Sequence, residues 1–324
     1  MRLPNKLQQM PRASALLGRR LSLDHTNLVA VELTAAAKLT VSLRVIGRRP
    51  DGFHLLESEM VTLDLVDSLV VRDGDGLSVA EAFEGSGEAG PWRSGGIDTG
   101  PENLVVRALR AVGRTAAVDL TKRIPPGAGL GGGSADAAAI LRWAGSADLV
   151  SAAALGSDVP FCLVGGRALV RGVGEDLTPL PFEERRFTLF LLPFGMDTGA
   201  VYAAWDRLHP AGGGSGAPGR NGASGGPSDA LPERGVNDLE EAAIDVEPRL
   251  AAWRDHLARL TGHRPWLAGS GSTWFVEGTP EELGLLARPV VQLGSEQALV
   301  VAVRTVPAIG EDATHPRGRA GGAW

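Results

Sequence analysis

Residues 125–136 read Pro125-Pro-Gly-Ala-Gly-Leu-Gly-Gly-Gly-Ser-Ala-Asp136, and five of the seven residues from 127 to 133 are glycine. A strand-like run, Ala117–Ile124, precedes this stretch, and an Ala-rich helix is expected over Ser134–Ala144. Without Cβ atoms, backbone amides can approach an oxyanion closely, and a helix N-terminus adds unpaired N–H groups and a favourable dipole. An ordinary turn needs one or two glycines, so the stretch predicts a phosphate-binding loop.

Three known nucleotide motifs compete for this loop. Gly127-x-Gly129-x-x-Gly132 matches the dinucleotide pattern, but no strand-like run precedes Asp148, which lies near the place of that motif's acidic residue. The Walker pattern also nearly fits, except that Gly133 stands at its lysine position. The His-Arg-Asp and Asp-Phe-Gly motifs of protein kinases are absent. The loop therefore indicates another kind of nucleotide site, and an NAD(P)-binding oxidoreductase remains the less favoured alternative.

The rest of the chain mixes strand and helix patterns without a regular βαβ rhythm. This favours an α+β fold over a doubly wound sheet. Expected strands cover residues 31–34, 39–46, 60–65, 68–72, 161–170 and 187–192, and expected helices cover 103–112 and 239–260, the latter interrupted at Pro248. Apolar residues over 290–306 are expected to end the fold.

Length and composition set the frame. A chain of 324 residues suggests two domains, and a net charge of -6 argues against non-specific nucleic-acid binding. The single cysteine, Cys162, cannot form an internal disulfide and is expected in a buried strand. Apolar stretches are too short to cross a bilayer, and we expect a cytoplasmic protein without a membrane partner.

Three segments are expected to lie outside the packed fold. Residues 1–30 are predicted to be a disordered extension, residues 210–235 a flexible low-complexity loop, and residues 309–324 a flexible tail. We predict that deletion of residues 1–30 and 211–232 leaves catalysis intact.

The glycine-rich string resembles the phosphate loop of the GHMP kinase superfamily, which includes galactokinase and the homoserine and mevalonate kinases. Further stretches follow in order along the chain: Ala36–Leu43, Arg49–Leu55, Asn103–Ala108, Leu155–Phe161, Gly172–Pro179, Asn237–Glu240 and Leu267–Ser272. With them the chain resembles, over roughly residues 34–306, the 4-diphosphocytidyl-2-C-methyl-D-erythritol kinases of the non-mevalonate isoprenoid pathway.

This resemblance implies a fold and a reaction. The fold would be a GHMP kinase fold, with an ATP-binding domain over 31–185 that resembles domain 2 of ribosomal protein S5. A C-terminal α/β sandwich domain over 186–308 would follow, with the site between the two. ATP, with Mg²⁺, would phosphorylate the 2-hydroxyl of the methylerythritol moiety of the cytidine diphosphate compound. A homoserine- or mevalonate-type kinase is the alternative within the superfamily.

The resemblance also implies a reacting pair, Lys38 and Asp158. Asp158 would take the proton of the acceptor hydroxyl, and Lys38 would neutralise developing charge, with the ammonium within about 4–6 Å of the carboxylate. By residue type alone, Asp158 could instead cap a turn and Lys38 could be a surface lysine. The chain has only three lysines, Lys6, Lys38 and Lys122, so we expect a lysine that persists to be needed as a compact ammonium.

The implied nucleotide site is the glycine-rich loop and its flanks. Asn103 would contact adenine or cap a helix, and Ser134 would donate its hydroxyl, hold Mg²⁺ or cap the next helix. The expected ATP-binding residues are Asn103, Pro125, Pro126, Gly127, Ala128, Gly129, Leu130, Gly131, Gly132, Gly133, Ser134 and Ala135.

Four residues are implied for the cytidine substrate. Phe53 would stack on cytosine, His54 would hydrogen-bond to it, and Tyr202 would form a second aromatic wall. Thr40 stands where the family commonly has asparagine, which puts an amide contact to substrate in doubt. The alternatives are a core phenylalanine, a solvated histidine and, for Tyr202, the start of an amphipathic helix.

Overall fold

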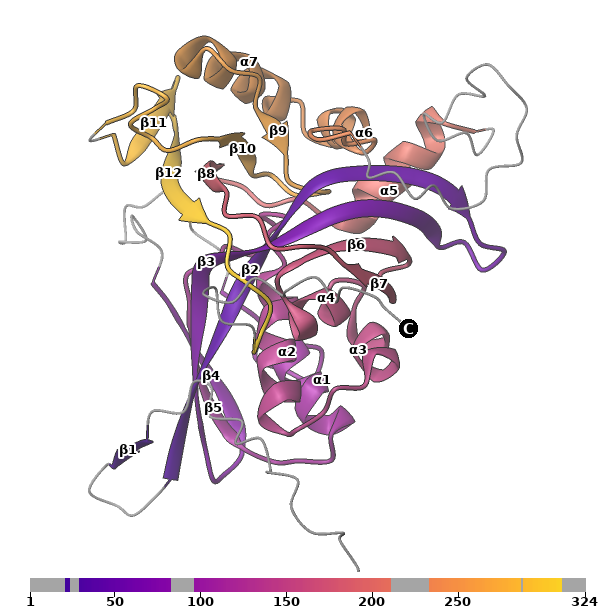
Figure 1. Ribbon diagram of the computed structural model, residues 1–324, viewed down its shortest axis with the longest axis vertical. Helices are drawn as coiled ribbons and strands as arrows, with labels where there is room; N and C mark the ends of the chain where they lie inside the picture. Colours follow the sequence, from indigo (N-terminus) through magenta and orange to yellow (C-terminus); the bar gives the residue numbers. More distant parts are fainter. Residues whose placement is uncertain (1–20, 24–28, 83–95, 211–232, 287, 311–324) are drawn as a thin grey trace, which may run out of the picture.

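The computed structural model describes residues 21–23, 29–82, 96–210, 233–286 and 288–310. Figure 1 shows two lobes. The N-terminal lobe holds the first sheet with helices α1–α4, and the C-terminal lobe holds the second sheet with α5–α7. The predicted α+β class is confirmed.

The first sheet has the strand order β1-β2-β3-β5-β4. The long strand β3 pairs with β5 over residues 68–72 and with β6 over residues 56–61, and β6 in turn pairs with β7. All neighbours are antiparallel except β4 and β5. Its strands are β1 (Leu21–Leu23), β2 (Val29–Arg48), β3 (His54–Arg72), β4 (Gly76–Glu81), β5 (Ala117–Lys122), β6 (Arg167–Gly172) and β7 (Asp176–Pro179).

Four of the short strands predicted from the sequence form only two long strands in the structure. Residues 31–34 and 39–46 belong to β2, and residues 60–65 and 68–72 belong to β3, with no break at Asp67. Three register shifts along β2, between Ala36 and Gly47, are the places where a long strand can bend without ending. The predicted disordered extension over 1–30 is wrong for residues 21–23, which form β1, and for residues 29–30, which begin β2 and pair with β1.

Helices α1 (Leu104–Ala111), α2 (Gly132–Trp143), α3 (Leu149–Leu155) and α4 (Val159–Val164) pack on the first sheet. The predicted strand over 161–170 is wrong in its first half, which forms α4. Pro160 suits the first turn of a helix, and Gly165, at φ 72°, ends it. Cys162 is therefore buried on a helix rather than on a strand.

The second sheet has the order β11-β12-β8-β10-β9. Its strands are β8 (Arg186–Leu191), β9 (Trp266–Leu267), β10 (Trp274–Glu277), β11 (Val290–Leu293) and β12 (Glu296–Arg304). Helices α5 (Thr198–Leu208), α6 (Glu240–Val246) and α7 (Arg249–Thr261) pack against it around buried Trp205, Trp253 and Trp274. The predicted helix break at Pro248 is confirmed, because α7 begins directly after it.

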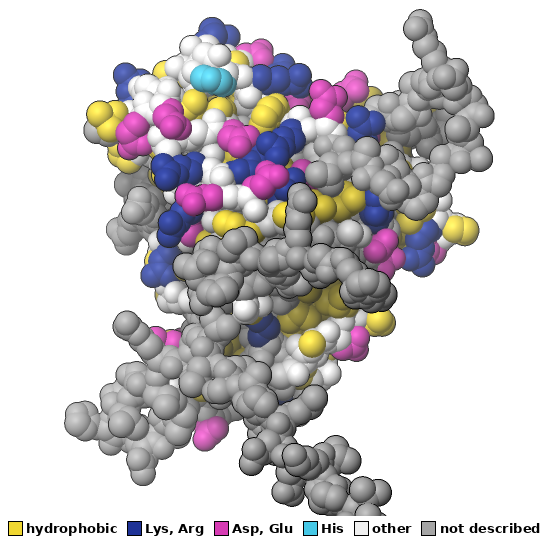
Figure 2. Space-filling model, viewed as in Figure 1, with side chains coloured by type: hydrophobic (Ala, Val, Ile, Leu, Met, Phe, Trp, Pro, Cys, Tyr) yellow, Lys and Arg dark blue, Asp and Glu magenta, His cyan; other side chains and the backbone are white. Residues whose placement is uncertain are grey.

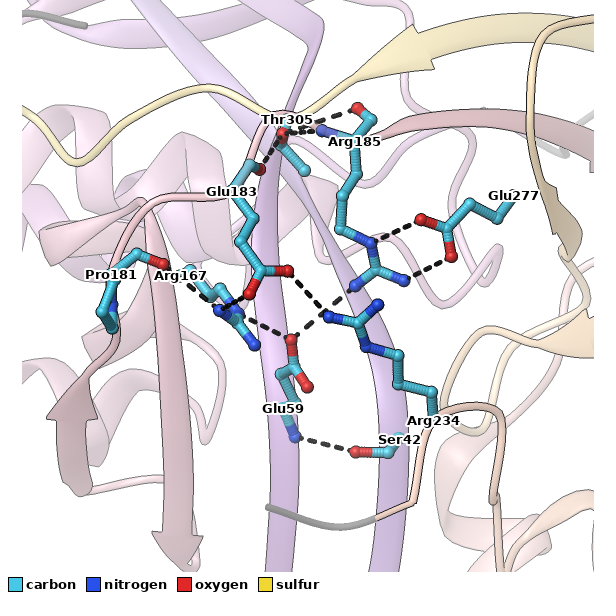
Figure 3. A network of polar contacts seen from close by, with 9 residues as sticks. All are labelled: Ser42, Glu59, Arg167, Pro181, Glu183, Arg185, Arg234, Glu277 and Thr305. Atoms are coloured by element: carbon cyan, nitrogen blue, oxygen red, sulfur yellow. Dashed lines mark hydrogen bonds and ion pairs between the residues drawn. The ribbon is translucent and has the colours of Figure 1, made fainter. Parts of the chain in front are cut away.

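Apolar packing and a network of charges join the two lobes. One core cluster combines Leu39 and Val61 of the first sheet with Phe187 and Phe275 of the second. Figure 3 shows the charges: Glu59, fully buried, pairs with Arg167 at 2.8 Å and with Arg185 at 3.7 Å. Arg185 in turn forms two hydrogen bonds with Glu277 of β10. Arg185 thus links Glu59 of β3, in the first sheet, to Glu277 of β10, in the second sheet.

The segments expected outside the fold lie largely among residues that are not described: 1–20, 24–28, 211–232 and 311–324. The end of the predicted loop is an exception, because the Gly235 amide donates to the Val41 carbonyl at 3.0 Å. None of the described helices is long and apolar enough to span a bilayer. On the face in Figure 2, Lys and Arg side chains are interspersed with Asp and Glu rather than gathered into one basic surface.

Candidate active site

A cleft of about 590 Å³ lies against the glycine-rich loop. Its walls come from both lobes: residues 125–134 and β2 on one side, α5 and the turn at 269–270 on the other. Every predicted ATP-binding residue except Ala135 lines it, together with Lys38, Thr40, Asp158 and Tyr202. Ala135 is buried in the first turn of α2, where its amide donates to the Gly131 carbonyl.

Three carbonyls of the loop are held by neighbouring segments. Gly127 accepts from the Met196 amide at 3.0 Å, Ala128 from the Thr273 amide at 3.2 Å, and Leu130 from the Lys38 amide at 3.0 Å. Because α2 begins at Gly132, with Gly131 as its N-cap, the amides of Gly132, Gly133 and Ser134 have no acceptor within the helix. The loop is thus fixed by both lobes and presents a helix N-terminus, as an anion site requires.

Close packing explains some of the glycines in the loop. Gly129, at φ 82°, leaves no room for a side chain, because a Cβ there would lie 2.1 Å from the Ala268 carbonyl oxygen. A Cβ at Gly131, at φ 67°, would lie 2.7 Å from Cγ of Lys38. These glycines therefore let the turn at residues 268–273, called the second glycine turn below, and the Lys38 stem approach the loop, in addition to any ligand.

Lys38 and Asp158 form an ion pair at the cleft, with Nζ and Oδ2 3.1 Å apart. The predicted proximity is confirmed. The Lys38 side chain is only 7% exposed, so it is not a surface lysine. Asp158 stands at the N-cap of α4, but its side chain makes no capping hydrogen bond, and the capping alternative is wrong. The roles of the pair in catalysis stay a prediction.

Thr40 lies next to this pair on β2 and is 2% exposed. The Lys38 ammonium donates to its Oγ1 at 3.0 Å. The hydroxyl thus contacts the lysine while lining the cleft. A contact between Thr40 and substrate stays a prediction.

The turn at 268–273, most of which belongs to the Leu267–Ser272 stretch of the family resemblance, forms the opposite wall of the cleft. Asn237 holds it by donating through Nδ2 to the carbonyls of Leu267, at 3.0 Å, and Gly269, at 2.7 Å. Ser270 Oγ lies 3.0 Å from Thr198 Oγ1 of α5, and both residues line the cleft. Sequence reasoning gave no role to Ser270, although it lies in the Leu267–Ser272 stretch, and it missed Thr198, which belongs to no motif.

A second lysine, Lys122, lies under the loop and also lines the cleft. It is buried and bonded to Asp67 and to Asp136, the latter at 2.7 Å. Burial and the nearby Asp67 charge raise the pKa of Asp136 to about 7, although Lys122 opposes this. Burial lowers the pKa of Lys122, but Asp136 and Asp67 outweigh it and raise that pKa overall. Scarcity of lysine was the only sequence signal for this cluster.

Of the residues implied for cytidine, His54 and Tyr202 meet at α5, and Thr40 and Tyr202 line the cleft, whereas Phe53 and His54 are not among its lining residues. The His54 ring stacks on Tyr202 with centroids 4.8 Å apart, and its Nε2 lies 2.7 Å from Asp206 Oδ1. The side chain of His54 is 9% exposed, so it is not a solvated histidine. Phe53 is 62% exposed, which rules out a core position. Tyr202 belongs to α5, as its pattern suggested, and also lines the cleft.

The two remaining nucleotide candidates behave differently. Asn103 is the N-cap of α1, with Oδ1 accepting from the Val105 amide, and it also lines the cleft. Ser134 does not cap α2, because Gly131 occupies the N-cap position, so that alternative is wrong. It lines the cleft from the third residue of the helix. Contacts of either residue with a nucleotide stay predictions.

Comparisons with known proteins identify a family model and relatives that match this chain. The family model "GHMP kinases N terminal domain" matches residues 103–166. The 4-diphosphocytidyl-2-C-methyl-D-erythritol kinase of Paracoccus denitrificans is 40% identical over 254 residues, covering 74% of this chain and 84% of that protein. The enzyme of the same name from Pelotomaculum thermopropionicum is 38% identical over 266 residues, covering 76% and 88%.

Solved structures of kinases also match the fold of this chain. A crystal structure of 4-(cytidine 5'-diphospho)-2C-methyl-D-erythritol kinase matches with a TM-score of 0.55 at 29% identity, covering 85% of this chain and all of that one. Mevalonate kinase of L. major matches with a TM-score of 0.54 at 10% identity, which speaks for a shared fold alone.

Proposed function

The chain belongs to the 4-diphosphocytidyl-2-C-methyl-D-erythritol kinases, within the GHMP kinases, and on that premise we propose that it transfers the γ-phosphoryl group of ATP to the 2-hydroxyl of 4-diphosphocytidyl-2-C-methyl-D-erythritol. The observation that carries the proposal is the Lys38–Asp158 pair, which lines the same cleft as the glycine-rich loop. The products are ADP and the 2-phosphate of the cytidine diphosphate compound.

The residues divide the work of the transfer. The bond between the γ-phosphorus and the oxygen bridging to the β-phosphate breaks, and a bond to the 2-oxygen forms. Asp158 Oδ2 accepts the proton of the attacking hydroxyl, and the Lys38 ammonium stabilises charge on the oxygens around phosphorus. The loop amides and the N-terminus of α2 hold the phosphates in line. Positioning and charge stabilisation supply most of what such a transfer needs.

We propose that His54, which stacks on Tyr202 of α5, recognises cytosine. An Asp206 carboxylate accepts a hydrogen bond from His54 when the proton is on Nε2, which leaves Nδ1 as an acceptor. An acceptor suits the exocyclic amine of cytosine rather than the carbonyl of uracil. Exposed Phe53, next in sequence to His54, offers a face on which a base can stack.

ATP brings its own metal requirement. Bound Mg²⁺ would neutralise phosphate charge during the transfer. The described part of the chain contains no group of three or more His, Cys, Asp or Glu side chains arranged around a metal position. Asp136 Oδ1, buried and without a hydrogen-bond partner, is the orphan acceptor beside the cleft, yet its carboxylate is already committed to Lys122. We therefore assign no protein ligand to the metal.

The division of the chain is part of the proposal. Residues 31–185 would form the ATP-binding domain and residues 186–308 the C-terminal domain. This agrees with the two sheets, although residues 305–309 return to the first lobe, where the Val306 amide donates to Thr62. We also propose a cytoplasmic location.

The direct test is ADP release measured in a coupled assay, with the cytidine diphosphate compound, its uridine analogue, homoserine and mevalonate compared at equal concentrations. We expect turnover with the cytidine compound and much less with the other three. Turnover with homoserine or mevalonate instead would assign the chain to another kinase activity. Binding of NADPH without binding of ATP would exclude a kinase.

A further inference from the structure

The Lys38 ammonium has three N–H groups, and the described residues occupy two of them. One faces Asp158 Oδ2 at 3.1 Å and another donates to Thr40 Oγ1 at 3.0 Å. Asp158, at the N-cap of α4, and Thr40, on β2, are held by different elements. Two anchors of this kind determine the direction of the third N–H.

The surroundings leave the ammonium little freedom to turn. A Cβ at Gly131 would lie 2.7 Å from Cγ and 3.1 Å from Cε of Lys38, so the stem lies against the phosphate loop. A Cβ at Gly269 would lie 3.7 Å from Lys38 Nζ and 3.6 Å from Thr40 Oγ1, so the second glycine turn closes the opposite side. Thr40 itself is 2% exposed, and it pairs with Met60 of β3 in the first sheet.

We propose that Thr40 is a positioning residue, which accepts one N–H of Lys38 and thereby directs another toward the phosphoryl oxygens in the cleft. The proposal rests on the kinase function proposed above. Because a misdirected charge stabilises a transition state poorly, loss of the Thr40 hydroxyl should lower kcat. The KM of either substrate should change little, because in this role Thr40 makes no ground-state contact with either substrate.

A direct contact between Thr40 and the cytidine substrate is the competing role. Loss of such a contact would raise the KM for that substrate and would act independently of Lys38. The two roles therefore differ in the parameter that changes and in how Thr40 and Lys38 combine.

The test compares wild type with Thr40→Val and Thr40→Ser, assayed with ATP and the cytidine diphosphate substrate. Valine keeps the shape and removes the acceptor, whereas serine keeps the acceptor and is the matched control. Hydrogen bonds to charged groups have effects of about 10- to 100-fold, so Thr40→Val should lose that much kcat with both KM values within about threefold. Thr40→Ser should stay within about threefold of wild type. Thermal unfolding of each variant shows that the valine is tolerated.

A double-mutant comparison completes the test. In a Lys38→Met background, Thr40→Val should change the single-turnover rate by less than about threefold, because the group that it positions is gone. An unchanged kcat in Thr40→Val, a raised KM, or a full additional loss in the Lys38→Met background would overturn the positioning role. If wild type itself fails to phosphorylate the cytidine compound, the proposed function falls, and this role with it.

Discussion

Two lysine–aspartate clusters touch neighbouring glycines of the phosphate loop, and their surroundings differ. The Lys38 stem lies against Gly131, whereas a Cβ at Gly132 would lie 3.0 Å from Lys122 Nζ. At Lys38 the partner carboxylate, Asp158, is 26% exposed and lines the cleft. Lys122 and Asp136 also line the cleft, so the solvent exposure of Asp158 is what distinguishes the first pair, and under the proposed function this exposure lets the pair meet a substrate.

The side chains of the second cluster are almost fully buried, and the cluster combines one lysine with two carboxylates. Lys122 meets two carboxylates, Asp67 and Asp136, whose side chains are 0% and 3% exposed. Asp67 also accepts from the Ile124 amide at 2.9 Å. The cluster thereby ties β3, β5 and α2 together beneath the loop. The comparison teaches that burial and partner number distinguish the two clusters, and under the proposed function they separate a pair that acts on substrate from a cluster that supports the fold.

The largest effect is expected from Asp158→Asn. An amide keeps the shape and cannot take the proton, so kcat should fall by about 10²–10⁴. The unfolding free energy should change by less than about 1 kcal/mol, because the carboxylate is partly exposed. Steady-state kinetics and urea denaturation measure the two quantities. A large loss of stability with normal kcat would make this pair structural.

The converse is expected for Lys122→Met. Removal of the lysine leaves two buried carboxylates unpaired, which should lower the unfolding free energy by about 3–5 kcal/mol. Asp158→Asn is the matched control, with activity lost and stability kept. A Lys122→Met protein as stable as wild type would show that the cluster does not support the fold.

The pH dependence of stability sharpens the contrast. Burial and Asp67 raise the pKa of Asp136 to about 7 in the folded chain, above its usual value of 3.8. The folded state therefore holds this proton more tightly, and the resulting stabilisation is present below pH 4 and is lost as the pH rises to about 7. Asp136→Asn should remove this part of the decline in urea midpoints between pH 4.5 and 8. A parallel decline in the variant would assign it to other groups.

The smallest effect is expected at an exposed pair. Arg304 and Asp64 lie 3.2 Å apart, and their side chains are 64% and 38% exposed. Because water screens such charges, Asp64→Asn should change the unfolding free energy by less than about 1 kcal/mol and leave kcat unchanged. A larger loss in thermal or urea unfolding would show that burial does not rank these pairs.

Sequence patterns were most informative where one residue type repeats or a motif is long. The glycine-rich loop, α2, the break at Pro248 and the Lys38–Asp158 proximity could all be anticipated. The proximity came through family resemblance, since 120 positions separate the two residues in the sequence. Single residues with partners far along the chain carry no such pattern.

Three features needed coordinates for that reason. Asp67 meets Lys122 across 55 positions, and Asn237 holds a turn 30 residues away. The short apolar run at 159–164 fits strand and helix alike, and tertiary packing together with Pro160 decides for α4. Long strands β2 and β3 looked like four short ones, because polar residues such as Asp67 are buried within them.

The most direct test of the reacting pair is a double-mutant cycle on Lys38 and Asp158, with kcat measured for wild type, Lys38→Arg, Asp158→Asn and the double variant. Arginine keeps the charge but has a bulkier, differently directed head group, so both single variants should be strongly impaired. If the two side chains act as one unit, the double variant should be little worse than the worse single variant. Losses that simply multiply would contradict that unit, and a Lys38→Arg protein with normal kcat would remove the lysine from the chemistry.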